Sequence, residues 1–298
     1  MKSAKFLPYV WYPVSFAVAI IVFGALLSHG SPIPIALYVP IVLIGLLIVA
    51  LEQWFPYRLD WRPSFADIKS DAAFLAIVQI FFPKVLGVIA VLAISEWTHA
   101  KMPSDWWPQA WPPAAQVILM VLVIDFMRYW VHRACHRFMW LWRLHEVHHS
   151  PDILYSLNVG RFHPLEKILH FFFDTIPFLL LGVAPQVLAG YALLYSVNGF
   201  FQHSNICLRY GWLNYLVGSA ETHRWHHAKD PKAASCNFGN TTIVWDLFFG
   251  TWYLPKDKTL DQIGIMNAAY PKDFLSQMVT PFRSFPYTQL SESFAVLS

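Results

Sequence analysis

Three short clusters hold eight of the thirteen histidines of this 298-residue chain. They read HRACH, HEVHH and HRWHH, and their histidines are His132, His136, His145, His148, His149, His223, His226 and His227. An α-helix turns by about 100° per residue, so the HxxxH and HxxHH spacings are expected to place the imidazoles of each cluster on one helix face. Because imidazole is the commonest metal ligand near neutral pH, three such faces predict a metal centre.

The number of histidines predicts two metal ions. A tetrahedral zinc site takes about four ligands, and eight imidazoles exceed that number. A single histidine in an apolar segment is more often a hydrogen-bonded core residue, but two separate HxxHH strings favour metal binding. The three cysteines, Cys135, Cys207 and Cys236, are too far apart for a CxxC pair, so they indicate neither a disulfide framework nor a thiolate metal site.

The composition places this centre in a membrane protein. Hydrophobic residues make up 56% of the chain and charged residues 13%, a balance beyond what a soluble domain of this length can bury. Residues 6–51 contain no charge and are long enough for two spans of about 20 residues each. The sequence His29-Gly30-Ser31-Pro32 predicts the turn between them. A cleaved signal peptide is the alternative, which Pro13 and the immediate second span disfavour.

Four further apolar stretches follow. Residues 72–94 are interrupted only by Pro83 and Lys84, and residues 114–131 run directly into His132, so the first cluster is expected to cap a membrane helix. Residues 168–183 and 187–201 are shorter and predict either a second spanning hairpin or a re-entrant one. We therefore expect one all-α, polytopic membrane domain over residues 1–298, with about four to six transmembrane or re-entrant helices.

The lysines and arginines predict the orientation of these helices. The turn at Gly30 has none, and residues 96–113 contain only Lys101. The opposite ends of the spans are basic, through Lys2, Lys5, Arg58, Arg62, Lys69, Arg133, Arg137, Arg143, Arg161 and Lys167. By the positive-inside rule, both termini and all three histidine clusters face the cytoplasm. The net charge of +3 follows from this bias, and no basic stripe indicates a nucleic-acid partner.

The order HxxxH, HxxHH, HxxHH is accompanied by characteristic sequence between the clusters. The segments are Asp125 with Arg128-Tyr129-Trp130, His163-Pro164-Leu165-Glu166, Gln202-His203-Ser204-Asn205, Asn237-Phe238-Gly239, Trp245-Asp246 and Phe249-Gly250-Thr251. With them, residues 114–254 resemble the fatty acid hydroxylase and sterol desaturase superfamily of integral membrane oxygenases. The resemblance implies a catalytic region over residues 114–254, in which a cytosolic helical cap carries the histidines over about four membrane helices.

The resemblance also implies the ligands, cofactors and partners. The eight clustered histidines would bind two non-haem irons, with His203 as a ninth ligand, and zinc can replace iron in purified protein. Such enzymes use O2 to hydroxylate or desaturate a lipid such as an acyl chain, a sterol or an aminolipid, and the sequence is compatible with each. The chain contains no HPGG haem motif, so the electrons would come from a separate reductase, ferredoxin or cytochrome b5-type donor.

Residues beside the clusters are expected to orient the ligands. Carboxylates often accept imidazole N–H groups in metal sites, and the candidates here are Asp125, Glu166, Glu221 and Asp246. Asn237 and His163 are further candidates, although His163 also suits a helix start. Asp125 lies seven residues before His132, two turns along the same helix, so at membrane depth it is expected to be functional or paired with Arg128. Three histidines outside every motif are expected to be structural: His29, His99 and His170.

Two other functions fit part of the pattern. The second cluster also satisfies HExxH, the zinc metalloprotease motif, in which His145, Glu146 and His149 would act. That interpretation leaves the other two clusters without a role. A bis-histidine haem carrier would instead need histidines within facing membrane helices, not in clusters at helix ends. Both are less favoured than a dimetal lipid oxygenase.

Overall fold

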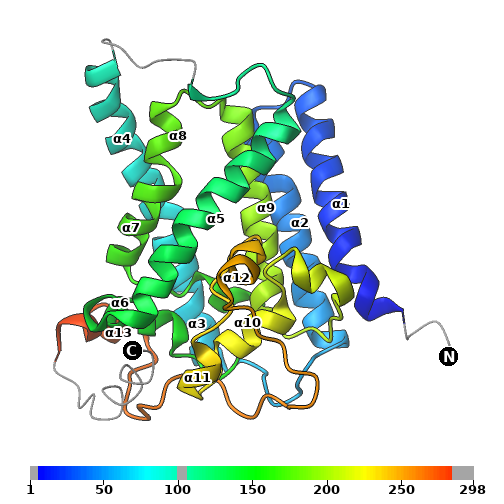
Figure 1. Ribbon diagram of the computed structural model, residues 1–298, viewed down its shortest axis with the longest axis vertical. Coiled ribbons are helices and arrows are strands. Elements are labelled where there is room, and N and C mark those ends of the chain that lie inside the picture. The colour runs from blue at the N-terminus through cyan, green and yellow to red at the C-terminus, as the bar shows by residue number, and fades with distance from the viewer. Residues whose placement is uncertain (1–5, 99–105, 284–298) are drawn as a thin grey trace.

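The computed structural model describes residues 6–98 and 106–283, and it confirms the predicted all-α membrane fold (Figure 1). Four helical segments are long and apolar enough to cross a membrane: Leu7–Ser28, Ile33–Trp54, Phe65–Ala93 and Pro113–Arg137. Only 11% to 39% of the residues in their apolar windows are buried, so most of their side chains are available to face lipid. The expectations for His99, Lys101 and the residues at the two ends of the chain concern residues 1–5, 99–105 and 284–298, which lie outside the described residues.

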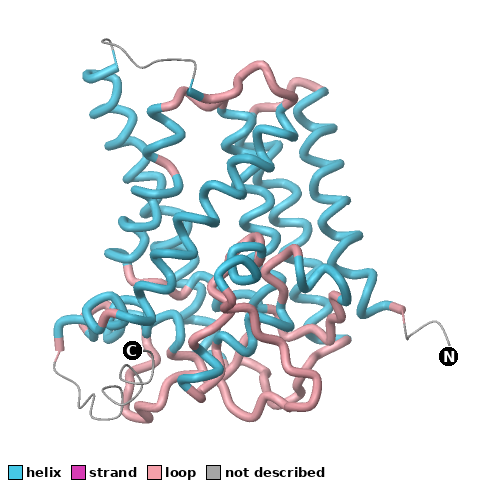
Figure 2. The backbone as a smooth tube through the Cα atoms, in the orientation of Figure 1, coloured by secondary structure: helices cyan, strands magenta, loops and turns pink. Residues whose placement is uncertain are grey.

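The molecule has two layers, which Figure 2 shows in one view. Long helices fill one layer, and most of the loops gather in the other with several short helices. We call this second layer, formed by residues 138–163 and 204–283, the cap. Within the described residues the cap contains no strand. Two isolated β-bridges tie its loops together, Val217 with Thr242 and Ala228 with Ile263, and a third joins Ile206 to Pro56, just beyond the second span.

The first two spans form the predicted hairpin of α1 (Leu7–Ser28) and α2 (Ile33–Trp54). In the turn between them Gly30 has a φ of 75°, a left-handed conformation that glycine adopts without steric cost. The Gly30 N–H donates to the carbonyl of Leu27, and the Ser31 N–H donates to that of Leu26, both at 3.0 Å. The last carbonyls of α1 are thereby satisfied within the turn.

The third span is one continuous helical run of α3 (Phe65–Ala73), η2 (Phe74–Phe81) and α4 (Phe82–Thr98). η2 is a π-helix that ends at Phe81, two residues before Pro83, a residue that has no N–H to donate to the helical ladder. Gly160 approaches this span so closely that a Cβ atom on it would lie 3.2 Å from the Leu75 Cα. The Gln79 side chain donates to the Gly160 carbonyl at 3.3 Å, which joins the third span to the segment after the second cluster.

The fourth span is α5 (Pro113–Arg137), followed by α6 (Met139–His149) in the cap. The two shorter apolar stretches form α7 (Pro164–Asp174), α8 (Ile176–Leu180) and α9 (Pro185–His203). In Figure 1 these three helices run beside α5 through the same layer. Thr175 separates α7 from α8, so the predicted second hairpin consists of a broken helix and one intact helix, α9. Helix α9 packs against α1, α2 and α5 and forms the centre of the bundle.

The cap contains short helices joined by loops. They are η4 (Ser156–Gly160), η5 (Gly211–Tyr215), α10 (Ala220–His226), α11 (Pro231–Ala234), α12 (Val244–Phe249), α13 (Phe274–Gln277) and η6 (Thr280–Phe282). Buried polar side chains of the long helices hold these loops. Glu52 of α2 accepts hydrogen bonds from the backbone N–H groups of Ser156 at 2.7 Å and Asn205 at 3.0 Å. Asn198 of α9 donates to the carbonyls of Gly218 at 3.1 Å and Asn240 at 2.9 Å. Paired hydrogen bonds in a water-poor interior fix the cap on the bundle.

The orientation of the layers can be tested by cysteine labelling. Cys207 is exposed in the cap, and its N–H donates to the Phe55 carbonyl just beyond α2. Ala110 is exposed in the loop before α5, at the opposite end of that helix from the first cluster. If the cap is cytoplasmic, as the basic loops predict, an impermeant maleimide on intact spheroplasts should label Ala110→Cys and leave Cys207 unlabelled until the membrane is opened. The Cys207→Ser variant provides the background, and labelling of Cys207 in intact spheroplasts would reverse the orientation.

Candidate metal centre

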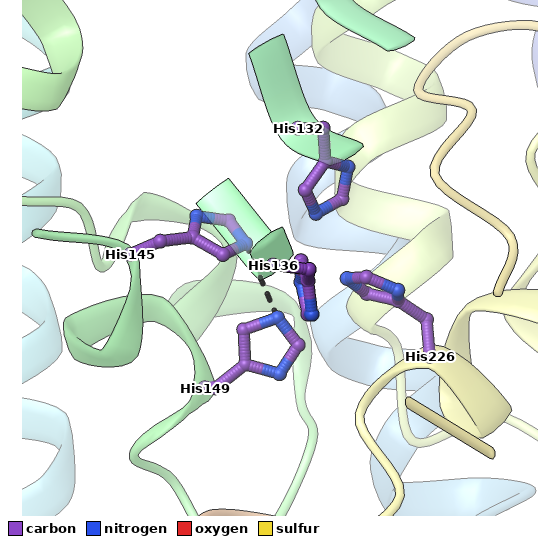
Figure 3. A group of neighbouring side chains, drawn as sticks. All are labelled: His132, His136, His145, His149 and His226. Carbon is purple, nitrogen blue, oxygen red and sulfur yellow. Dashed lines mark hydrogen bonds between the residues drawn. The ribbon is translucent and has the colours of Figure 1, made fainter. Parts of the chain in front are cut away.

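Nine histidines converge in two groups at the cap end of the bundle. The first group is His132, His136, His145, His149 and His226, and the second is His148, His203, His223 and His227. Figure 3 shows the first group, with rings from α5, α6 and α10 turned toward one another. In each group the ligand nitrogens all lie within 4.8 Å of one another. Nitrogens on opposite sides of one ion are about 4 Å apart, because metal–nitrogen bonds are about 2 Å long. Each group therefore has the dimensions of a single metal site.

Four helices supply these rings. The first cluster lies at the end of α5 and the second on α6, and Phe138 between them is extended, with φ of −111° and ψ of 121°, which ends one helix and starts the next. The third cluster lies on α10, where the Ser219 side chain caps the helix by accepting from the Thr222 N–H at 3.1 Å. His227 is the C-cap of α10, and His203 is the last residue of α9. Most of the nine histidines thus lie at or near the ends of helices.

Each HxxHH cluster contributes to both groups, which differs from the expectation that a cluster acts through one face. His145 and His149, four residues apart on α6, join the first group, while His148 joins the second. In the third cluster the division is reversed, because the i, i+4 pair His223 and His227 joins the second group and His226 joins the first. Adjacent helical residues point about 100° apart, so the two imidazoles of an HH pair reach different centres. The two groups touch where the rings of His149 and His227 stack, with centroids 4.4 Å apart.

Main-chain carbonyls fix three of the rings. A carbonyl only accepts hydrogen bonds, so the imidazole nitrogen that faces it carries the proton and the other nitrogen keeps its lone pair. The pairs are His132 Nδ1 with the Phe238 carbonyl at 2.8 Å, His226 Nδ1 with the Cys236 carbonyl at 2.7 Å, and His148 Nδ1 with the Arg161 carbonyl at 3.2 Å. In each of these histidines Nε2 is the nitrogen free to bind a metal.

Two side chains fix two more rings. The Nδ1 atom of His145 lies 2.7 Å from Oε1 of Glu166, which is in the first turn of α7. The Nδ1 atom of His203 lies 2.8 Å from Oδ1 of Asn158. The Asn158 amide donates to the Ile153 carbonyl at 2.8 Å, which assigns its oxygen to the side of His203. Both imidazoles therefore also direct Nε2 toward their group.

The inner nitrogens of these groups fit metal ions. Three of them are buried without a hydrogen-bond partner: His132 Nε2, His136 Nε2 and His226 Nε2. In the second group the Nε2 atom of His223 lies 3.0 Å from that of His203 and 3.1 Å from that of His227. A buried polar atom left unpaired costs about 1 to 3 kcal/mol, and a bound cation removes that cost. Burial, reinforced by the neighbouring imidazoles, lowers the pKa of the cap histidines well below the usual value, namely for His148, His149, His223, His226 and His227. These rings are neutral at pH 7 and can donate a lone pair.

Glu166 lies at the centre of a smaller cluster behind His145. The Cys135 Sγ, a His145 nitrogen and a Glu166 oxygen lie within 4.8 Å of one another. His170, expected to be structural, has its Nε2 atom 3.5 Å from Glu166 Oε1. The Nδ1 atom of His145 contacts Glu166, and its Nε2 atom faces the first histidine group. Cys135, Glu166 and His170 therefore support the His145 ring from outside the metal site.

Asp246 and Asn237 act through the backbone. Asp246 accepts hydrogen bonds from the N–H groups of Phe238 at 2.8 Å and Gly239 at 2.7 Å. Because the Phe238 carbonyl receives the His132 N–H, Asp246 positions that imidazole through one peptide group and not by direct contact. Asn237 has a φ of 54°, and its amide donates to the Thr222 carbonyl in α10 at 2.9 Å. It fixes the loop after α10 to the helix that carries the third cluster.

Asp125 contacts the cap loop and not an imidazole. Its carboxylate accepts a hydrogen bond from the Thr242 N–H, which draws residues 241–242 onto α5. Within the described residues Arg128 forms its ion pair with Asp174 of α7, so the expected alternative of an Asp125–Arg128 pair is wrong. This hydrogen bond to the cap explains why the Asp125 carboxylate is tolerated within a membrane helix.

His163 and Glu221 lie outside the two histidine groups. His163 is the N-cap of α7, where its Nδ1 atom accepts from the Leu165 N–H at 3.2 Å, which is the helix-start role named above. Glu221 accepts from the Tyr210 N–H at 2.8 Å and from the Asn214 amide at 2.9 Å, and so it ties α10 to η5. Neither side chain contacts an imidazole of the groups through these bonds.

Sequence reasoning did not find the main-chain acceptors. The carbonyls of Phe238, Cys236 and Arg161 orient three rings, yet any residue type supplies a carbonyl, so the sequence contains no signal for them. The Asn158 side chain is different, because an amide near the second cluster can hydrogen-bond to the metal cap and is visible in the sequence; its Oδ1 atom does contact His203.

The fold and the site together define a polytopic membrane protein with a histidine-built metal site. Residues 117–251 match the family model described as fatty acid hydroxylase. A relative is also 30% identical over 270 residues, covering 87% of this chain and 80% of its own length. The chain belongs to the fatty acid hydroxylase family and is a lipid-modifying oxidoreductase.

Several relatives are named hydroxylase or monooxygenase. The 30% identical protein is the ornithine lipid hydroxylase OlsE of Rhizobium tropici. The alkylglycerol monooxygenase of Xenopus tropicalis is 28% identical over 174 residues, 58% of this chain and 38% of its own length. The human alkylglycerol monooxygenase is 27% identical over 139 residues, 47% of this chain and 31% of its own length. No solved structure shows a significant match to the chain.

The contact between Glu166 and His145 can be tested by metal retention. Replacing Glu166 by Ala removes the acceptor that fixes the His145 ring, and loss of such a partner weakens metal binding by about 10- to 100-fold. The measurement is the metal that remains on nanodisc-embedded protein after dialysis against graded chelator. The exposed carboxylate of Asp257 serves as the control, and Asp257→Ala should retain metal like the wild type. Equal retention by both variants would show that His145 keeps its orientation without Glu166.

Proposed function

We propose that this chain is a diiron hydroxylase that uses O2 and an external electron donor to oxidise a C–H bond of an ornithine lipid or a related aminolipid. The observation that carries the proposal is the convergence of nine histidines into groups of five and four. The substrate class is supported by the ornithine lipid hydroxylase of Rhizobium tropici, which is similar over most of both chains. Hydroxylation is favoured over desaturation because the relatives are named hydroxylase and monooxygenase.

The two ions would be held by the two groups. His132, His136, His145, His149 and His226 would bind the first ion, and His148, His203, His223 and His227 the second. Neutral imidazoles suit iron as well as zinc, so zinc can occupy the same nitrogens in a purified preparation. When bound, a pair of ferrous ions supplies the electrons with which O2 is activated to attack an alkyl C–H bond.

The residues of the chain hold the ligands and keep water away. In five of the nine rings an acceptor at Nδ1 keeps the proton on the outer nitrogen, so the Nε2 lone pair stays directed inward. Eight of the nine histidines are buried and His132 is half-buried. His132 lies on α5, and the Phe238 ring packs 5.5 Å from its imidazole and 5.7 Å from that of His226. This apolar ring beside the half-buried ligand favours the approach of a hydrocarbon over water.

The domain organisation and the partners follow from the same proposal. We take residues 1–298 as one membrane domain and residues 114–254 as its catalytic region. The cap would face the cytoplasm, where a reductase, a ferredoxin or a cytochrome b5-type protein can deliver electrons. No haem-binding HPGG sequence occurs in these 298 residues.

The dinuclear centre predicts two metal ions per chain. Elemental analysis of purified wild-type protein should give two ions, iron in the working form. His226→Ala removes a ligand from the first group only, and it should lower the content toward one ion. A fully active wild-type protein with a single ion would eliminate the dinuclear proposal.

The substrate predicts a mass change in membrane lipids. Cells that produce the chain together with an ornithine lipid should accumulate a species heavier by one oxygen atom, detected by comparative lipid mass spectrometry with and without the protein. A product lighter by two hydrogens would indicate desaturation, and an unchanged lipid profile under aerobic growth would reject the aminolipid.

Glu146 distinguishes the oxygenase from the metalloprotease alternative. In a metalloprotease Glu146 is the general base, so Glu146→Gln abolishes turnover while His226→Ala leaves the zinc site intact. In the oxygenase the order is reversed, and His226→Ala should eliminate the oxidised lipid while Glu146→Gln keeps measurable activity. Both variants must be compared as inserted, folded protein. An inactive Glu146→Gln beside an active His226→Ala with bound metal would contradict the proposed function.

A further inference from the structure

A charged pair lies inside the helix bundle, one turn from the metal centre. Arg128 of α5 donates through Nε to both carboxylate oxygens of Asp174 of α7, at 2.9 and 2.8 Å. Both side chains are about nine-tenths buried. Arg128 precedes His132 by four residues, so its Cα atom lies about 6 Å from that of His132 along the helix axis, on the membrane side.

Two tyrosines of α9 complete this polar cluster. The Arg128 Nη1 atom donates to the Tyr195 hydroxyl at 3.2 Å, and the guanidinium lies 4.6 Å from the Tyr195 ring centroid. The ring of Tyr191 stacks on that of Tyr195, with centroids 6.0 Å apart. Tyr191 also interacts electrostatically with Asp174 and Arg128. We call Arg128, Asp174, Tyr191 and Tyr195 the intrabundle polar cluster.

The cluster has more hydrogen-bond donors than acceptors. Tyr195 already accepts a hydrogen bond from Arg128, and within the described residues its own hydroxyl proton has no acceptor. Tyr191 is 7% exposed, and its buried hydroxyl has no hydrogen-bond partner in the described part of the chain. The carboxylate of Asp174 is engaged by Arg128. A ligand that satisfies this cluster must therefore bring an acceptor oxygen.

The ion pair alone does not explain the tyrosines. Joining α5 to α7 requires Arg128 and Asp174, and a phenylalanine would fill the space of Tyr191 among the surrounding apolar side chains, which include Trp107, Met120 and Phe178. A hydroxyl buried there without a partner costs about 1 to 3 kcal/mol relative to one that is paired. Tyr195 is only partly buried, so the cluster is open on its side and not sealed within the core.

We propose that the intrabundle polar cluster binds the ester or amide carbonyl of the substrate lipid. The inference rests on the proposed function and deepens it, because it gives the lipid a fixed point one helical turn from the metal centre. The carbonyl oxygen accepts hydrogen bonds from Tyr191 and Tyr195, and the Arg128–Asp174 pair holds Tyr195 in place. A substrate fixed at its carbonyl presents a defined set of C–H bonds to the histidine groups, whereas an apolar tunnel alone permits sliding.

Binding of a labelled lipid tests this site without turnover. The probes are N-palmitoyl-ornithine and 1-palmitoylglycerol, each with a ¹³C-labelled carbonyl, and they are titrated into nanodisc-embedded protein and followed by isotope-edited infrared spectroscopy. In the wild type the labelled carbonyl band should shift to lower frequency on binding, for the amide, the ester or both. Tyr191→Phe and Tyr195→Phe should each reduce the shift and weaken binding by about three- to tenfold per hydroxyl.

Tyr210 offers a matched control. Its hydroxyl is also buried without a partner within the described residues, but the ring packs against Tyr12 of α1, in a different core cluster from Tyr191. Tyr210→Phe should bind both probes like the wild type. Tyr191→Phe removes a hydroxyl that has no partner among the described residues, so the thermal stability of this variant should equal or exceed that of the wild type.

The outcomes separate this inference from the proposed function. Equal affinity and an unchanged carbonyl band in the two cluster variants would overturn the carbonyl site, as would an equal loss in Tyr210→Phe. A wild-type protein that binds the probes with the expected shift but yields no oxidised lipid would support the site and reject the proposed function. A shift with only one probe identifies the linkage as an amide or an ester.

Discussion

The structure depends on one constraint, which is that nine imidazoles must be packed together with their lone pairs turned inward. Neutral rings lower the cost of burial, but each outer N–H still needs an acceptor in a place without water. Five of these acceptors are visible, and three of them are carbonyls of loops whose own course is fixed by other contacts. The loop after α10 is a good example, because Asp246 and Asn237 hold the peptides that in turn hold His132 and His226. The cap loops thus take the course that supplies hydrogen-bond acceptors to the imidazoles.

The membrane helices also help to position the imidazoles, through polar side chains that contact the cap. Buried polar side chains are expensive in a membrane helix, yet α2, α5 and α9 each have at least one that reaches into the cap. Glu52 accepts from two separate loops, and Asn198 bridges two carbonyls of a third. These contacts place the ends of α5 and α9, and therefore His136 and His203, in register with α6 and α10. Membrane insertion and assembly of the metal centre are consequently parts of one folding process.

Much of this architecture was predictable from sequence, for physical reasons that differ between elements. The absence of charge over residues 6–51 predicts a helical hairpin, because a backbone in lipid must form its hydrogen bonds within the segment. Gly30 predicts the turn, because glycine adopts positive φ without steric cost. The histidine clusters indicated a metal centre because their residue type and spacing are unusual. The division of each HxxHH cluster between two groups was not predictable, since it depends on how α6 and α10 are rotated against each other. The pairing of Arg128 with Asp174, 46 residues away, depends likewise on the packing of α7.

The stacked rings of His149 and His227 have a consequence for how the centre is loaded. Each ring belongs to a different group, and they share a face with centroids only 4.4 Å apart. An ion bound to one ring also restricts the rotation of the ring stacked on it. Less rotational entropy is then lost when the second ring binds its own ion. Through this ring contact each ion would favour binding of the other, by reciprocity to the same degree. Such cooperativity would disfavour half-loaded protein at limiting metal, so that a chain tends to be either empty or complete.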